Sequence, residues 1–158
     1  MINWAHVHLM INHVPVIGML GALLLLIYAV IKKSDEVRTI SFGLMILLAL
    51  ITVAVYFTGT FAEKVVKDLP GVAEAYIGRH EEMGELSLVL MSLLGIAALV
   101  GMVIRRRTGN IPKCTLSVVL LMSLITAVIL GITANLGGQI RHTEIRAGAP
   151  SAVAPETR

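Results

Sequence analysis

The sequence predicts an all-α integral membrane protein built as a four-helix bundle. Of its 158 residues, 56% are hydrophobic and only 15% are charged, and the mean hydropathy is +0.86. Soluble domains carry about 25% charged residues, so these values are typical of a membrane protein. Four separate apolar segments each approach the ~20 residues that cross a ~30 Å hydrocarbon core. We therefore expect one transmembrane domain over residues 1–146.

The four predicted helices cover about residues 9–31, 39–58, 86–104 and 114–136. The first segment has no basic region before it and no small-residue cleavage motif after it. We therefore expect a retained transmembrane helix and not a secretory signal. Residues 147–158 are rich in Ala, Pro, Ser and Thr and have little to bury, which predicts a flexible C-terminal tail.

Basic residues are concentrated in two short loops. The loops KKSDEVR, between the first and second helices, and RRRTGNIPK, between the third and fourth, hold seven of the thirteen Lys and Arg residues. The positive-inside rule makes these loops cytoplasmic and places both termini on the outer, periplasmic side of a bacterial inner membrane. The acidic loop over residues 61–85 suits that outer face. Because the basic runs flank apolar segments without aromatic interleaving, they indicate lipid anchoring and no nucleic-acid partner.

All five histidines fall on the predicted outer side. His6, His8 and His13 lie at the start of the first helix, His80 leads into the third, and His142 follows the fourth. A single histidine at a membrane interface is often merely solvated. Five in one layer, with none in either cytoplasmic loop, favour a common binding site.

Stripes of small or polar residues run down the helices from these histidines. On the fourth helix, Gly131, Asn135 and Gly138 share a face with His142, and similar stripes mark the other three helices. Such stripes commonly pack membrane helices closely together. They also leave room for a flat cofactor, and both interpretations remain open at this stage.

Neutral imidazoles ligate haem iron, copper or zinc, and helix bundles build such sites from inward-facing side chains. A b-type haem needs axial histidines, apolar walls and cationic partners for its propionates. His13 is the best-placed ligand because it lies past the start of the apolar run, with His80 and His142 as partners. Arg79 and Arg141 each directly precede a histidine and would meet the propionates. The single cysteine excludes covalent attachment through Cys-x-x-Cys-His.

A copper or zinc site is the metal alternative. Its ligands would come from His13, His80 and His142, with His8 and Glu63 less suited. His6 and His8 alternate on a short N-terminal stretch, and no HExxH spacing occurs. Nucleophile elbows, phosphate loops and paired-carboxylate patterns are also missing from the sequence. An electron carrier or a non-catalytic subunit of an oxidoreductase complex is therefore expected over a self-standing hydrolase or transferase, and a cofactor-free structural subunit is the second alternative.

Four short motifs carry a family resemblance: INHVPVIG, TGTFAE, IGRHEEMGE and LGGQIRH. Together they resemble a family of uncharacterised bacterial four-helix inner-membrane proteins. Its members typically show His-x-Pro in helix one, here His13-Val14-Pro15, and Gly-Gly-x-(Leu/Ile)-x-(Tyr/His) after the last helix, here ending at His142. The chain departs from this pattern after His142, where TEIRAGAPSAVAPETR replaces the more common histidine- or tyrosine-glycine turn.

The resemblance implies the four-helix topology, and some members look like b-type cytochromes or sit beside c-type cytochrome domains. Together with the histidine layer, it predicts a membrane electron-transfer protein that holds haem b near the outer leaflet. The protein would act as a small cytochrome or as a subunit of a respiratory complex. Its expected partner is a c-type cytochrome or a larger respiratory membrane complex.

Overall fold

The structure, a computed structural model that describes residues 2–146, is all-helical over that range. Its helices are α1 (Trp4–Ile11), α2 (His13–Ile31), α3 (Asp35–Val66), α4 (Glu74–Thr108) and α5 (Lys113–Gln139), followed by the short 3-10 helix η1 (Thr143–Ile145). With α1 and α2 counted as one span, four helices are long and apolar enough to cross a membrane. The predicted fold class is therefore confirmed. The tail predicted over residues 147–158 lies outside the described residues.

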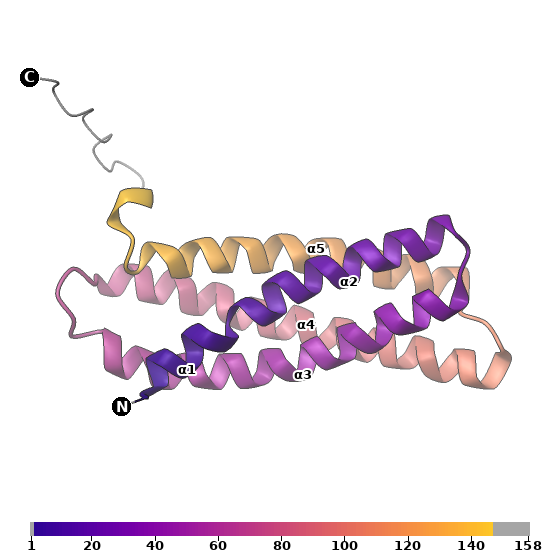
Figure 1. The fold of residues 1–158 in the computed structure, drawn as a ribbon, viewed down its shortest axis with the longest axis horizontal. Helices are drawn as coiled ribbons and strands as arrows, with labels where there is room; N and C mark the ends of the chain where they lie inside the picture. Colours follow the sequence, from indigo (N-terminus) through magenta and orange to yellow (C-terminus); the bar gives the residue numbers. More distant parts are fainter. Residues whose placement is uncertain (1, 147–158) are drawn as a thin grey trace, which may run out of the picture.

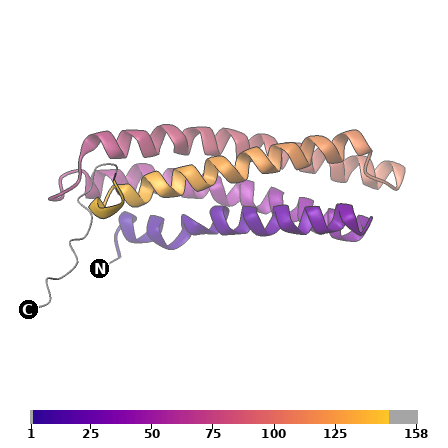
Figure 2. The same ribbon diagram turned by 90° about the horizontal axis from the view of Figure 1, so that it is seen from above.

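The four long helices run up and down beside one another and form a closed bundle (Figures 1 and 2). α2 packs against α3, α3 against α4, α4 against α5, and α5 against α2. The fully buried centre consists mainly of apolar side chains from all four, including Met19, Leu26, Phe42, Leu94 and Val119. Outward-facing leucines, isoleucines and valines cover the rest of the bundle and suit a lipid environment.

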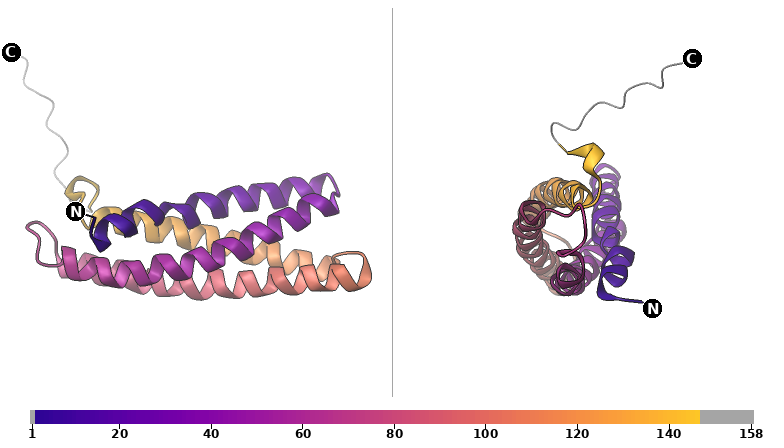
Figure 3. Two further views of the ribbon diagram at one scale, coloured as in Figure 1. Left: turned by 60° about the horizontal axis from the view of Figure 1, so that its bottom comes forward. Right: turned by 90° about the vertical axis from the view of Figure 1, so that its left-hand side faces the viewer.

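The first span is broken at Asn12, which lies between α1 and α2. Pro15 causes this break, because it has no N–H to donate to the carbonyl of Ile11 and its ring crowds that carbonyl. On the N-terminal side of the break, α1 packs on α3 and makes a few contacts with α2. Its backbone does not approach α4 or α5. Figure 3, right, looks along the bundle from the end at which α1 begins.

The helices extend beyond the apolar segments that hydropathy marks. α3 continues to Val66 and α4 starts at Glu74, so the predicted loop over residues 61–85 shrinks to residues 67–73. Hydropathy locates the lipid-crossing part alone, whereas Ala, Glu, Lys and Met are good helix formers outside the membrane too. At ~1.5 Å per residue, the 35 residues of α4 span ~52 Å, which exceeds a ~30 Å hydrocarbon core.

Local signals set the helix ends in the basic loops. Ser34 caps α3 by accepting a hydrogen bond from the N–H of Val37 (3.4 Å), and Asp35 and Glu36 follow in the first turn. α4 ends at Gly109, whose φ of 85° permits the left-handed turn that stops the helix. The basic residues of both loops gather at one end of the bundle, and the five histidines lie toward the opposite end.

Candidate functional site

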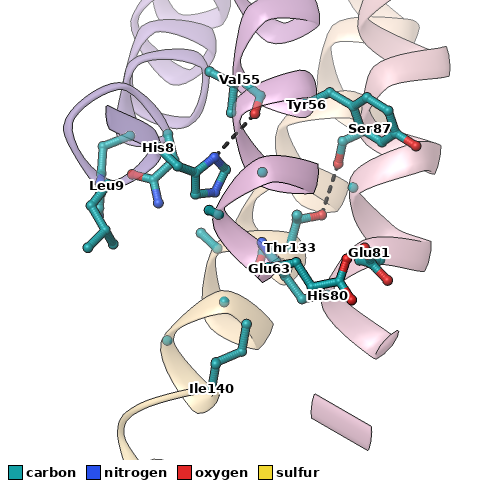
Figure 4. A pocket seen from close by; sticks show the side chains of 18 of the residues that line it. His8, Leu9, Val55, Tyr56, Glu63, His80, Glu81, Ser87, Thr133 and Ile140 are labelled. Carbon is teal, nitrogen blue, oxygen red and sulfur yellow. Dashed lines mark hydrogen bonds between the residues drawn. The ribbon is translucent and has the colours of Figure 1, made fainter. Parts of the chain in front are cut away.

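A cavity of about 390 Å³ lies at the histidine end of the bundle, between α1, the end of α3, the start of α4 and the end of α5. Apolar side chains make up most of its walls. Figure 4 shows the polar groups that enter it. Four of the five histidines line the cavity: His8, His13, His80 and His142. His6 does not line it, and its Nδ1 lies 3.0 Å from Oδ1 of Asn3.

His8 reaches from α1 across to α3. Its Nδ1 lies 3.2 Å from the carbonyl oxygen of Val55 and 3.3 Å from Oγ1 of Thr58. The ring rests on Gly59, where an added Cβ would lie 3.2 Å from Cε1 of His8. Because Gly59 has no side chain, the imidazole can approach the α3 backbone closely (Figure 4).

His80 is held in the same way on the other hairpin. It projects from α4 to α5, and its Nδ1 lies 3.0 Å from the carbonyl oxygen of Thr133. The ring rests on Gly137, where an added Cβ would lie only 2.9 Å from Cε1 of His80. In each case the glycine follows the accepting residue by four positions. One helical turn therefore supplies both the carbonyl oxygen that accepts the hydrogen bond and the room for the imidazole ring.

The two anchored rings share one protonation pattern. A carbonyl oxygen cannot donate, so Nδ1 of His8 and of His80 must carry the proton. In the neutral imidazole this leaves Nε2 as a free lone pair. The ring centroids are 6.4 Å apart with an interplanar angle of 75°. A metal-binding histidine usually donates its other ring N–H to a backbone carbonyl in this way, which fixes the tautomer.

The remaining predicted residues occupy different places. His13 and His142 line the cavity but are exposed, so they lie at its rim. Arg141 and Glu63 also line it, whereas Arg79 is exposed and does not. The sequence favoured His13 over His8. The structure instead places the ring of His8 near the ring of His80, because α1 is helical and holds His8 against α3.

The acidic groups at this end form two sets. Glu63 and Glu81 line the cavity, and the hydroxyl of Tyr56 donates to Oε1 of Glu85 (3.3 Å). Within residues 2–146, no three His, Cys, Asp or Glu side chains are positioned to hold one metal ion. The multidentate copper or zinc site weighed from the sequence is therefore not preformed in the part of the chain that the structure describes.

His142 forms a pair with Glu144 just after α5. Its Nδ1 lies 2.8 Å from Oε1 of Glu144, and both side chains are largely exposed. A hydrogen bond from the backbone N–H of Glu144 itself, and next the one from His142, lower the pKa of the Glu144 carboxyl. Glu144 is thus ionised at neutral pH and orients the imidazole of His142, leaving its Nε2 directed elsewhere.

Arg146 fastens the end of α5 to the start of α4. Its guanidinium donates to the carbonyls of Gln139 (2.8 Å), Ile140 (3.0 Å) and Gly71 (3.2 Å). It also stacks over Tyr76 at 4.3 Å from the ring centroid. Because Tyr76 precedes His80 by one helical turn, this cluster holds α4 and α5 together beside the contact of His80 with Gly137.

Comparison with known proteins gives one match. A family model described as "Predicted membrane protein (DUF2231)" matches residues 5–144, which include α2 to α5, all but the first residue of α1, and the residues that line the cavity. No curated protein and no solved structure matches the chain.

Proposed function

The chain belongs to the DUF2231 family of predicted membrane proteins, and from its cavity we propose that it is a membrane electron-transfer protein holding a b-type haem between His8 and His80. One observation carries this proposal. Both rings are fixed through Nδ1 to backbone carbonyls of different hairpins, which leaves two Nε2 lone pairs in one cavity.

The separation of the two rings fits a pair of axial ligands. With a metal–N bond of ~2.0 Å and ~1 Å more to the ring centre, two imidazoles on opposite sides of one metal ion have centroids ~6 Å apart. The observed distance is 6.4 Å. Three or four ligands around a tetrahedral zinc ion would bring the rings closer together than this.

The size and lining of the cavity favour an organic cofactor over a bare ion. About 390 Å³ lies within the range of sites for small molecules and cofactors, and the walls are largely apolar. Arg141 at the rim would meet a propionate as a charged hydrogen-bond donor. When bound, the haem would supply one-electron exchange. His8 and His80 would hold it, and the glycines under them would keep both rings in place.

The same proposal includes the location. Since the basic loops lie at the end opposite the cavity, the positive-inside rule supports a bacterial inner membrane with the site toward the periplasm. A periplasmic c-type cytochrome or a larger respiratory complex would then exchange electrons with the protein. Its role would be that of a small cytochrome or of one subunit among several.

The visible spectrum of the purified protein tests the proposal directly. Protein isolated in detergent from its native membrane should show a b-type spectrum after dithionite reduction and give a pyridine haemochrome. A blank spectrum with one bound copper or zinc ion would assign the two histidines to a metal instead. A blank spectrum without metal would leave a structural subunit and contradict the proposal.

The glycine under His80 provides a second prediction. In the Gly137→Ala variant, the new Cβ would push the His80 ring away from the carbonyl of Thr133, because it would lie 2.9 Å from Cε1. We expect haem to dissociate about tenfold more readily, equivalent to about 1.4 kcal/mol. The matched control is Gly131→Ala on the same helix, where nothing lies within 4 Å of the added Cβ. Equal haem retention in the two variants would show that the His80 contact does not matter.

A further inference from the structure

On the side between α1 and α5, which we call the opening, no helix packing closes the cavity. Both helices line it, α1 through Ala5, His8 and Leu9 and α5 through Thr133 and Ala134. Yet the α1 backbone packs on α3 and α2 and does not approach α5. Around the cavity α1 packs on α3, α3 on α4 and α4 on α5, whereas the backbones of α1 and α5 border it without packing on each other.

This opening faces the apolar side of the bundle. No Asp, Glu, Lys or Arg occurs in residues 2–31 or in residues 114–140, the two stretches that border it. At the same end, α3 and α4 carry charged side chains, among them Glu63, Lys64, Arg79 and Glu82. On the α1 side, the exposed apolar side chain of Leu9 lines the cavity. The surface on either side of the opening is therefore uncharged, as suits contact with the bilayer.

The two rim histidines come from the ends of different helices. His13 begins α2, just beyond the break at Asn12, and within residues 2–146 its ring makes no hydrogen bond. His142 follows α5, and its Nδ1 is committed to Glu144. Neither ring is anchored to a helix backbone as His8 and His80 are. Both therefore have ring nitrogens available to a molecule at the mouth of the cavity.

We propose that this mouth binds the head group of a lipid-dissolved isoprenoid quinone or quinol. Such a molecule combines a flat ring bearing oxygens on opposite edges with a long apolar tail. Histidine N–H groups donate to quinone oxygens, and the free Nε2 of His142, oriented by Glu144, accepts from a quinol hydroxyl. The tail would remain between the uncharged faces of α1 and α5. This inference rests on the proposed function in one respect, namely that the bound quinone would exchange electrons with the haem.

Binding of a short-chain ubiquinone analogue to the full chain in lipid nanodiscs tests this inference. The single tryptophan, Trp4, directly precedes the cavity-lining Ala5, and its ring packs against Phe61 of α3, so its fluorescence is the intrinsic signal to follow. We expect saturable quenching in the native protein. The His13→Ala/His142→Ala variant and the Ala134→Phe variant, which fills the opening, should each raise the dissociation constant at least tenfold. The Ala54→Phe and His6→Ala controls, at positions that do not line the cavity, should bind as the native protein does.

The outcomes separate this inference from the proposed function. Non-saturable quenching, or equal affinity in every variant, would overturn the quinone site even if the haem spectrum is present. Saturable binding lost in both test variants would support the site, and it would do so even in protein that shows no haem spectrum. Because Ala134 is exposed, its substitution tests the opening without disturbing the buried core.

Discussion

Replacing His8 and His80 together with alanine is expected to abolish the b-type absorption spectrum of the purified protein. Each ring is the proposed source of one axial nitrogen, and within residues 2–146 the other cavity histidines are exposed at the rim. They are also not held against a helix by a backbone carbonyl. Single variants, which keep one of the two histidines, should retain haem more weakly and show an altered spectrum. Absorption spectra of the oxidised and reduced proteins, with haem quantified per chain, provide the measurement.

The matched control for the double variant is His6→Ala. His6 lies in the same helix as His8 but does not line the cavity, and its Nδ1 lies 3.0 Å from Oδ1 of Asn3 near the chain start. Its spectrum should equal that of the native protein. If the His8→Ala/His80→Ala protein is folded by circular dichroism and still retains a low-spin b-type spectrum, then haem is bound elsewhere and the assigned ligand pair is wrong.

The Gly95→Ala variant is expected to lose about 1–3 kcal/mol of stability, the usual cost of overpacking a tight core. Gly95 lies on α4 where it meets α3, and an added Cβ would lie 2.7 Å from Cβ of Ala49. Ala49 cannot move aside through a side-chain rotation, so the two helices must separate. Thermal unfolding in detergent, followed by circular dichroism, provides the measurement.

Gly78→Ala on the same helix is the control for this prediction. Nothing lies within 4 Å of a Cβ added there, so the substitution should stabilise α4 by up to ~1 kcal/mol through helix propensity alone. The two variants make the same chemical change and are expected to shift the unfolding temperature in opposite directions. A stabilised Gly95→Ala protein would mean that the α3–α4 contact is looser than the structure indicates.

The sequence alone was sufficient to predict the class and the number of spans. Membrane helices satisfy their own backbone hydrogen bonds, so each span appears as a continuous apolar run regardless of its neighbours. The helix ends were less predictable. Residues 59–66 and 74–85 are polar enough to resemble a loop, yet they continue α3 and α4, since a helix outside the membrane needs no apolar face all round.

The histidine layer was also visible in the sequence, and the structure brings four of its five members to one cavity. The sequence did not reveal which two of these histidines are held by a backbone carbonyl. His13 seemed the better ligand because it lies deeper in the apolar run, while His8 seemed to belong to a loose N-terminal stretch. Pro15 breaks the helix between them, and α1 then packs on α3 so that His8 meets Val55 and Gly59.

The apolar runs and the loops between them were thus enough to predict the four spans, their order and the end of the bundle that carries the histidines. The tertiary structure decided which histidines are anchored in the cavity, because the ring on one helix is held by a carbonyl and a glycine on another helix. The partners of His8 lie about 50 positions away in the sequence, as do those of His80. A hydrogen bond between residues so far apart depends on how the helices pack, and no spacing within a single helix reports it.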